Sequence, residues 1–256
     1  MNELIRVGVV GCGYWGPNLI RNFSLLQESE VKTVCDFSHE RLNHMKTMYR
    51  VDVATDYTSM VTDPEIDAIA IATPVSSHFE LARMSLEAGK HTYIEKPLTA
   101  TVEQGRELVA LAEEKGLTLM VGHTFIYSAP IRKIKEILSS GEIGDLLYIS
   151  SQRLNLGLFQ KDINVAWDLA PHDISIILHI MGSFPESVNC QGKNHIHRNI
   201  EDVTNMSLDF ADKGFATILS SSLDPNKMRR MTFVGTKKMI LYDDNKPIEK
   251  LRIYDK

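Results

Sequence analysis

The chain has 256 residues, of which 43% are hydrophobic and 24% charged, so it can form one large or two modest globular domains. A formal net charge of −5 argues against a surface that binds nucleic acid or an anionic membrane. Because no apolar run approaches the ~20 residues of a membrane span, we also expect no membrane partner.

Apolar strand runs alternate with amphipathic helical stretches in the first half of the chain. The expected strands are Ile5–Val10, Val31–Cys35, Asp52–Ala54, Ala68–Ala72, His91–Glu95 and Leu117–Val121. The expected helices lie near 16–27, 39–49, 77–88 and 102–115, and the last two end at Gly89 and Gly116. Continuous apolar strands that alternate with helices predict an α/β domain over residues 1–122, built on a doubly wound parallel sheet.

The pattern changes after Gly122. A helix near 130–139 and a strand Leu146–Arg153 precede a helix from about Asp168 to Gly182. The remaining expected strands are Ser187–Gln191, Val203–Phe210, Phe215–Ser222, Met231–Val234 and Met239–Tyr242, with hairpin turns at 212–214 and 235–237. This order predicts a second, α+β domain over residues 123–256 with a mostly antiparallel, open sheet. Because one side of such a sheet lacks a cover, we expect a homodimer or homotetramer joined through it.

A Gly-Cys-Gly-Tyr-Trp-Gly segment follows the first expected strand and opens a helix. In this context Gly11 allows a tight turn, Gly13 lets the backbone approach a pyrophosphate, and Gly16 lets helix and strand pack closely. The free N–H groups of the first helical turn then hold the phosphates. We therefore expect a Rossmann dinucleotide site that includes Tyr14 and Trp15, with a glycine turn that binds no ligand as the alternative.

Asp36 ends the second expected strand, where a carboxylate reaches the ribose hydroxyls of the adenosine. Because a carboxylate repels a 2′-phosphate, NAD is favoured over NADP as the cofactor. Arg41 could instead pair with such a phosphate, although an exposed helix charge is the simpler interpretation. Asp36 could also be only a turn residue.

Two further strand ends supply candidate cofactor residues, because doubly wound sheets bind ligands at the carboxyl edge. Thr73 and Pro74 end the central strand, and His78 opens the next helix, where a capping or surface histidine is an equal alternative. Glu95 and Lys96 precede a proline at the end of another strand. Proline at this place can fix a cis peptide that directs the lysine into a cleft.

Asp168 and His172 are four residues apart, so on a helix they share one face. Asp168 fits an N-cap, and Pro171 would then fall in the first turn, where proline is tolerated. The helix then becomes strongly apolar, so polar groups at its start either face a cleft or lose solvation at a cost. A structural cap explains Asp168 alone, but it explains His172 less well.

The three cysteines, Cys12, Cys35 and Cys190, form no CxxC pair. Their odd number and scattered positions favour reduced thiols and no metal site. The N-terminus leads directly into a strand pattern, without a signal peptide. Together these features predict a cytoplasmic protein.

Taken together, these motifs resemble those of the Gfo/Idh/MocA oxidoreductases, the glucose–fructose oxidoreductase and inositol dehydrogenase family, over essentially the whole chain. The resemblance rests on the glycine loop, Ala72-Thr73-Pro74 with His78, Glu95-Lys96-Pro97, Ser140-Gly141-Glu142-Ile143-Gly144 and Asp168-x-x-x-His172. It implies that Lys96, Asp168 and His172 form the catalytic set. It also implies that Glu95 lies near the nicotinamide ribose.

Two features depart from the family pattern. Ala170 and Pro171 occupy the middle of a motif that usually reads Asp-x-Gly-x-His, so we expect a slightly different helix start. Family members are also usually longer by a few strands and a terminal helix. We therefore expect the substrate domain to continue beyond Lys256.

The expected function is that of an NAD-dependent oxidoreductase acting on a secondary alcohol of a sugar. A nucleotide sugar is preferred on the resemblance alone. The alternatives are a free polyol or inositol dehydrogenase, an NAD-dependent glycosidase and a non-catalytic NAD-binding regulator. Retention of Lys96, Asp168 and His172 together argues against the regulator, which would need the fold but not the proton chemistry.

Overall fold

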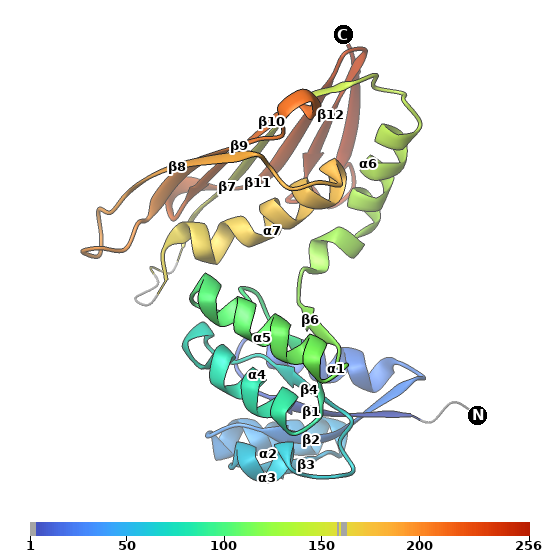
Figure 1. The fold of residues 1–256 in the computed structure, drawn as a ribbon, viewed down its shortest axis with the longest axis vertical. Helices are drawn as coiled ribbons and strands as arrows, with labels where there is room; N and C mark the ends of the chain where they lie inside the picture. Colours follow the sequence, from blue (N-terminus) through green and yellow to red (C-terminus); the bar gives the residue numbers. More distant parts are fainter. Residues whose placement is uncertain (1–3, 158, 160–162) are drawn as a thin grey trace. The chain divides into compact units, whose positions relative to one another are not determined.

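The computed structural model describes residues 4–157, 159 and 163–256. The chain divides into two compact units, Met1–Gly122 and His123–Lys256 (Figure 1). Each unit has its own sheet and its own hydrophobic core, so the two are described separately.

The first unit is a six-stranded parallel sheet in the order β3-β2-β1-β4-β5-β6. Its strands are β1 Ile5–Val10, β2 Ser29–Cys35, β3 Asp52–Ala54, β4 Ala68–Ile71, β5 His91–Ile94 and β6 Leu119–Val121. Its helices are α1 Gly16–Leu25, α2 His39–Tyr49, α3 Tyr57–Val61, α4 His78–Glu87 and α5 Val102–Glu114, with a short 3₁₀ turn η1 at Val75–Ser77. The predicted doubly wound fold is confirmed.

Helices cover both faces of this sheet, which is why the central strand β4 is apolar throughout. Leu19 and Leu42, from α1 and α2, pack into one core, and Leu86 and Leu108, from α4 and α5, pack into the other. The short helix α3 was not expected from the sequence. It has five residues and is capped by Asp56, whose carboxylate accepts hydrogen bonds from two backbone N–H groups of its first turn.

The second unit is a seven-stranded sheet in the order β13-β12-β11-β7-β10-β9-β8. Its strands are β7 Leu146–Leu156, β8 Ser187–Lys193, β9 Val203–Asp209, β10 Phe215–Ser221, β11 Leu223–Gly235, β12 Lys238–Asp243 and β13 Leu251–Asp255. Its helices are α6 Ala129–Ser139 and α7 Val165–Met181, with 3₁₀ turns η2 at Thr124–Tyr127 and η3 at Ala211–Lys213. Only β7 and β10 pair in parallel, so the predicted mostly antiparallel sheet and both predicted hairpins are confirmed.

The start of α7 was predicted wrongly. The helix begins at Val165, and Asn164 rather than Asp168 caps it, since the Asn164 Oδ1 accepts from the backbone N–H of Trp167 at 2.9 Å. Asp168 therefore lies inside the first turn, and Pro171 lies in the helix interior. Asparagine and aspartate are both favoured at the N-cap position. Asp168, the one nearer to the apolar run, was the wrong prediction.

Helices α6 and α7 lie along the same side of the second sheet (Figure 1). Ile134 of α6 and Ile177 of α7 pack with Ile218 and Phe233 of the sheet in a single core. Because side chains alternate along a strand, Tyr148 and its cross-strand partner Phe215 project from the other face, where their rings stack with centroids 5.6 Å apart. Within the described residues, no helix combines the length and apolar character needed to cross a bilayer.

Candidate active site

The three glycines of the loop after β1 differ in what a side chain at each position would contact. Gly11 has a φ of +93°, and a Cβ there would lie 2.7 Å from the carbonyl oxygen of Ala72. A Cβ on Gly16 would run into the carbonyl oxygen of Gly11. At Gly13 the nearest atom to such a Cβ is Nη1 of Arg41, 3.9 Å away. The fold itself thus requires glycine at 11 and 16, whereas at 13 the missing side chain leaves open space for a ligand.

Helix α1 begins directly after this loop. It has Pro17 in its first turn and no side-chain cap on its first backbone N–H groups. Tyr14 and Trp15 stack on each other at its start with centroids 6.4 Å apart, and Tyr14 is 93% exposed. An uncapped helix N-terminus that follows a glycine turn fits the pyrophosphate of a dinucleotide.

Asp36 follows β2 and is held by the backbone of two loops. Its Oδ2 accepts from the N–H of Cys12 at 2.7 Å, and its Oδ1 accepts from the N–H of Ser38 at 2.8 Å. Each oxygen keeps a second lone pair, so the carboxylate can still accept from ribose hydroxyls. Asp36 lines an open pocket of about 680 Å³ together with Phe37 and Arg41.

Arg41 belongs to the same pocket rather than to a remote helix surface. Its Nη1 lies 3.8 Å from the Oδ2 of Asp36, and the side chain is 56% exposed. Arg41 is thus an exposed charge on a helix, as expected, and its guanidinium also lies near the carboxylate that we expect to contact the ribose. Whether a 2′-phosphate is attracted or repelled there depends on both groups.

His78 is buried, and its ring contacts the segments that follow strands β4 and β5. Its side chain opens α4, and the residue is only 1% exposed, so the surface histidine considered above is excluded. Nε2 lies 2.9 Å from the carbonyl oxygen of Thr73, and Nδ1 lies 2.9 Å from that of Pro97. Burial lowers the pKa of His78, with the backbone hydrogen bonds acting in the opposite direction. The ring thus joins the segment after β4 to the one after β5.

The residues after β5 sit on the same carboxyl edge. The Lys96–Pro97 peptide bond is cis. Glu95 accepts a hydrogen bond from the hydroxyl of Tyr93 at 2.9 Å. Burial raises the pKa of Glu95, and hydrogen bonds from Tyr93, Lys96 and Trp15 oppose that rise. The structure therefore brings Trp15 of the glycine loop to Glu95.

Asp168 and His172 lie on α7 in the second unit. They are four residues apart in one helix and so share a face. The His172 ring packs edge-on against Phe125 of η2, with centroids 4.8 Å apart and planes at 60°. Phe125 was not singled out from the sequence, because it is 47 positions away and only the fold brings it to His172.

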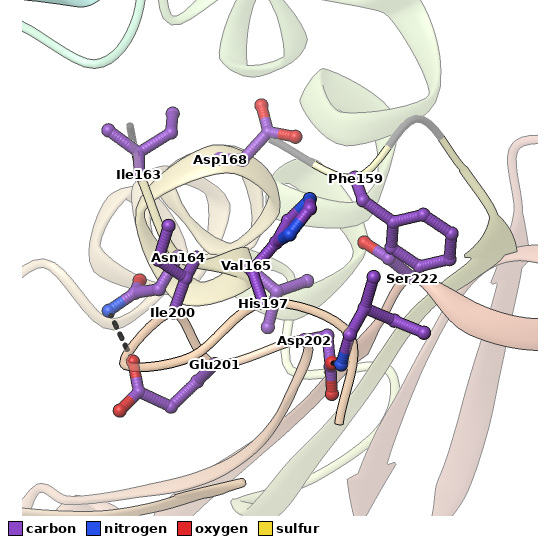
Figure 2. Close-up of a pocket in the computed structure, with 11 residues that line it drawn as sticks. Phe159, Ile163, Asn164, Val165, Asp168, His197, Ile200, Glu201, Asp202 and Ser222 are labelled. Atoms are coloured by element: carbon purple, nitrogen blue, oxygen red, sulfur yellow. Dashed lines mark hydrogen bonds between the residues drawn. The ribbon is translucent and has the colours of Figure 1, made fainter. Parts of the chain in front are cut away.

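Asp168 also lines a small cavity of about 20 Å³ at the start of α7 (Figure 2). His197 and Asp202 of the segment between β8 and β9 line the same cavity. Asp202 is buried and organises this segment, because its carboxylate accepts from the backbone N–H groups of His195 and Ile196 at 2.7 and 2.8 Å. The side chain of His195 contacts it at 2.7 Å.

The predicted residues thus fall into two sets. The cofactor set lies at the carboxyl edge of the first unit: Gly11, Gly13, Tyr14, Trp15, Gly16, Asp36, Thr73, Pro74, His78, Glu95 and Lys96. Asp168 and His172 lie on one helix of the second unit. In the part of the chain that the structure describes, no group of three His, Cys, Asp or Glu side chains is arranged to hold a metal ion.

A parallel sheet in the order 3-2-1-4-5-6, with a glycine loop after its first strand, defines a dinucleotide-binding protein. Two family models identify which kind. The model for the oxidoreductase family with an NAD-binding Rossmann fold matches residues 5–123, and the model for the GFO/IDH/MocA C-terminal domain matches residues 131–241. The chain belongs to the GFO/IDH/MocA family and is an NAD-binding oxidoreductase.

Three relatives are similar to different extents. The chain is 25% identical to 2,7-anhydro-N-acetylneuraminate hydratase of Escherichia coli over 98% of its own length and 70% of that protein. It is 29% identical to UDP-N-acetylglucosamine 3-dehydrogenase of Acidithiobacillus ferrooxidans, over 73% of itself and 58% of that protein. It is 27% identical to the NADP-linked scyllo-inositol 2-dehydrogenase IolW of Bacillus subtilis, over 73% of itself and 54% of that protein.

A crystal structure of a protein from Magnetospirillum magnetotacticum MS-1 has the same fold, with a TM-score of 0.87 and 26% identity. The match covers 99% of this chain and 81% of that one. The chain therefore spans about half to four fifths of the length of these relatives.

Proposed function

We propose that this chain carries the catalytic machinery of an NAD-dependent dehydrogenase that acts on a secondary alcohol of a sugar, preferably a nucleotide-linked sugar. The proposal rests on three features that occur together. They are the open space for a ligand at Gly13, Lys96 just after β5, and the pair Asp168 and His172 on α7. A protein that only bound NAD would need the first of these features and not the others.

Each residue has a defined part in the proposed reaction. Bound NAD supplies the acceptor for the hydride of the alcohol carbon. His172 takes the hydroxyl proton as general base. Lys96 hydrogen-bonds the same oxygen and stabilises the negative charge that develops on it. Asp168 orients His172 or the substrate from the same helix face.

The pyrophosphate would lie over Gly13 and the first turn of α1, and the adenosine ribose would lie at Asp36. We propose NAD over NADP because the carboxylate of Asp36 is fixed in place by two backbone N–H groups. Trp15 and Glu95 would then border the nicotinamide end of the cofactor.

The preferred substrate class rests on the relatives. The similarity to UDP-N-acetylglucosamine 3-dehydrogenase supports a nucleotide sugar, and the similarity to scyllo-inositol 2-dehydrogenase supports a free cyclic polyol as the alternative. The hydratase relative supports a second candidate, a reaction without net reduction of the cofactor, as in an NAD-dependent glycosidase.

The proposal is tested by incubating the protein and NAD with UDP-N-acetylglucosamine, scyllo-inositol, myo-inositol and 2,7-anhydro-N-acetylneuraminate, and by following both reduced cofactor and substrate. We expect net cofactor reduction with one of the first three. His172→Ala should lower kcat by roughly 10²–10⁴ without changing NAD affinity. His179→Ala, a histidine later on the same helix, is the matched control.

Three results would contradict the proposal in different ways. Stabilisation by NAD without conversion of any substrate indicates a regulator. Substrate conversion without net cofactor reduction indicates the redox-neutral reaction. A His172→Ala variant with near-native kcat would require another base.

A further inference from the structure

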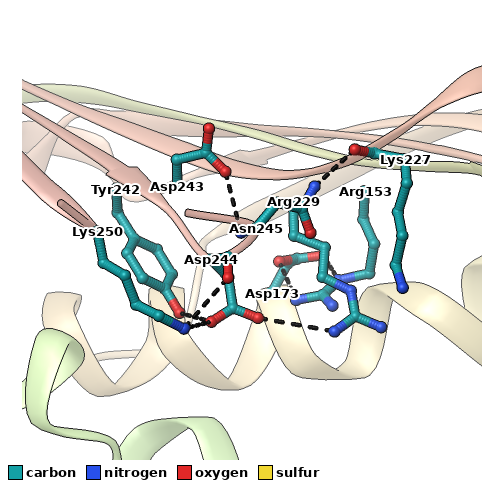
Figure 3. A network of polar contacts seen from close by, with 9 residues as sticks. All are labelled: Arg153, Asp173, Lys227, Arg229, Tyr242, Asp243, Asp244, Asn245 and Lys250. Atoms are coloured by element: carbon teal, nitrogen blue, oxygen red, sulfur yellow. Dashed lines mark hydrogen bonds and ion pairs between the residues drawn. The ribbon is translucent and has the colours of Figure 1, made fainter. Parts of the chain in front are cut away.

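A charged pair is buried beneath helix α7, next to the proposed base. Nε of Arg153, on β7, donates to Oδ2 of Asp173 at 2.7 Å, and its Nη2 donates to Oδ1 at 2.9 Å (Figure 3). The two side chains are only 7% and 3% exposed. The bond is therefore bidentate and shielded from solvent, and Asp173 directly follows His172 in the chain.

Stability alone does not account for this pair. Removing two charges from water costs several kcal/mol each, and well-packed apolar side chains in their place are often as stabilising. Apolar side chains could be packed in place of this pair, because its neighbours Ala170, Ile176 and Ile177 on the same helix pack into the hydrophobic core. The pair therefore calls for a second role, and its planar, two-bond geometry fixes orientation in a way that apolar contacts do not.

Arg153 is linked to His172 indirectly, through two other residues. Through the chain, it holds the carboxylate of the adjacent residue, Asp173. Through space, its Cζ lies 5.1 Å from the centroid of the Phe125 ring, and that ring is the one packed edge-on against His172 at 4.8 Å. One guanidinium thus binds the carboxylate at position 173 and also contacts the ring that packs against the imidazole.

Pro171 makes such an anchor necessary. A proline in a helix interior has no N–H for the preceding turn and its ring crowds the carbonyl four residues earlier. The turn with Asp168 is held from the other side, where the Val165 N–H donates to the carbonyl of Glu201 at 2.8 Å. After the proline, the Arg153–Asp173 pair provides the corresponding hold on the segment that carries His172.

We infer that Arg153 is a positioning residue for His172, acting through its bidentate bond to Asp173 and its contact with the Phe125 ring. The inference rests on the proposed function, in which His172 is the base. It assigns no contact between Arg153 and substrate or cofactor. It does predict that removing the ion pair lowers the catalytic rate but changes the stability of the fold little.

The decisive variant is Arg153→Met/Asp173→Leu, which removes both charges and leaves neither one buried alone. We expect the full chain to fold with little change in Tm. We expect kcat for the substrate found in the panel above to fall about ten- to a hundredfold, because a displacement of about 1 Å is enough for such a loss. The KM for NAD and the KM for the substrate should change little. Arg153→Lys, which keeps the charge and loses the fork, should also lower kcat.

Two further measurements separate positioning from general damage. The matched control is Arg6→Met/Asp67→Leu, which removes a bidentate pair from the first unit and should leave kcat unchanged. In ¹³C-histidine-labelled protein, the His172 ring resonances, assigned by their loss in His172→Ala, should shift in the Arg153→Met/Asp173→Leu variant, because the Phe125 ring lies only 4.8 Å away.

Wild-type kcat in the double variant together with unshifted His172 resonances would overturn the inference. Failure of the proposed function gives a different result, namely a wild-type protein that converts no substrate or a His172→Ala variant that remains active. In that case the ring resonances alone decide whether Arg153 positions His172.

Discussion

Replacing Asp36 by asparagine should change which nicotinamide cofactor the protein prefers. The substitution keeps the shape of the side chain and removes its charge. The carboxylate is 10% exposed and is fixed by the N–H groups of Cys12 and Ser38, so it is unable to turn away from an incoming 2′-phosphate. We expect the wild-type protein to bind NAD at least tenfold more tightly than NADP, which is ~1.4 kcal/mol.

The magnitude follows from the charges at this pocket. Two like unit charges about 5 Å apart repel by about 3 kcal/mol at an effective dielectric of about 20, and by about 0.8 kcal/mol in bulk water. The pocket is open, so the true value falls between these limits, and Arg41 at 3.8 Å from Asp36 cancels part of it. In Asp36→Asn only the attraction of Arg41 for the phosphate remains, so the preference for NAD should shrink about tenfold or reverse.

Calorimetric titration of each variant with NAD and NADP measures this directly. The ratio of the two Kd values is the informative quantity, because any loosening of the loop weakens both cofactors alike. Asp52→Asn, an exposed carboxylate on β3, serves as the control. A ratio that stays within twofold of wild type in Asp36→Asn would refute the electrostatic reasoning. Equal affinities in the wild type would instead identify Arg41 as a phosphate partner.

Three other outcomes are expected. Gly13→Ala should fold normally, because a Cβ there meets no atom closer than 3.9 Å, yet lose most of its NAD affinity by calorimetry; unchanged affinity would remove Gly13 from the site. Light scattering should show a dimer or tetramer that Tyr148→Glu dissociates, because the Tyr148–Phe215 stack lies on the uncovered sheet face; a monomeric wild type at micromolar concentration would contradict this. Burial raises the pKa of the Cys12 thiol to about 12, so iodoacetamide at pH 8 should modify the exposed Cys190 first, and mass spectrometry that finds Cys12 alkylated first would contradict this.

The sequence predicted the first unit well because its signals are local. Strand runs, cap glycines and the glycine loop each lie within a few residues of the structure that they specify. His78 shows the limit of such reasoning. Its two partners, the carbonyls of Thr73 and Pro97, come from different strand ends, and only the order of the sheet brings them together.

The second unit was harder to predict because its structure depends more on contacts between residues far apart in the sequence. Leu223–Gly235 forms one long strand, although Asp224, Pro225 and Asn226 are typical of turns, because pairing with β7 resumes after an irregularity between Leu223 and Met228. The last strand, Leu251–Asp255, was not expected. Arg153, Asp173 and Phe125 lie far apart in the sequence, and their partnership depends on tertiary packing.

Strand β7 has a consequence for how this chain is synthesised and folded. It lies in the middle of its sheet, yet both of its neighbours, β10 and β11, leave the ribosome some 60 residues or more after it. Neither edge of β7 can be satisfied by a local hairpin, so the strand stays unpaired until residues 215–235 have been synthesised. Long-range pairing of this kind is slow and leaves open edges exposed to other chains. The second unit, rather than the nucleotide-binding unit, should therefore set the rate of folding and the demand for chaperones.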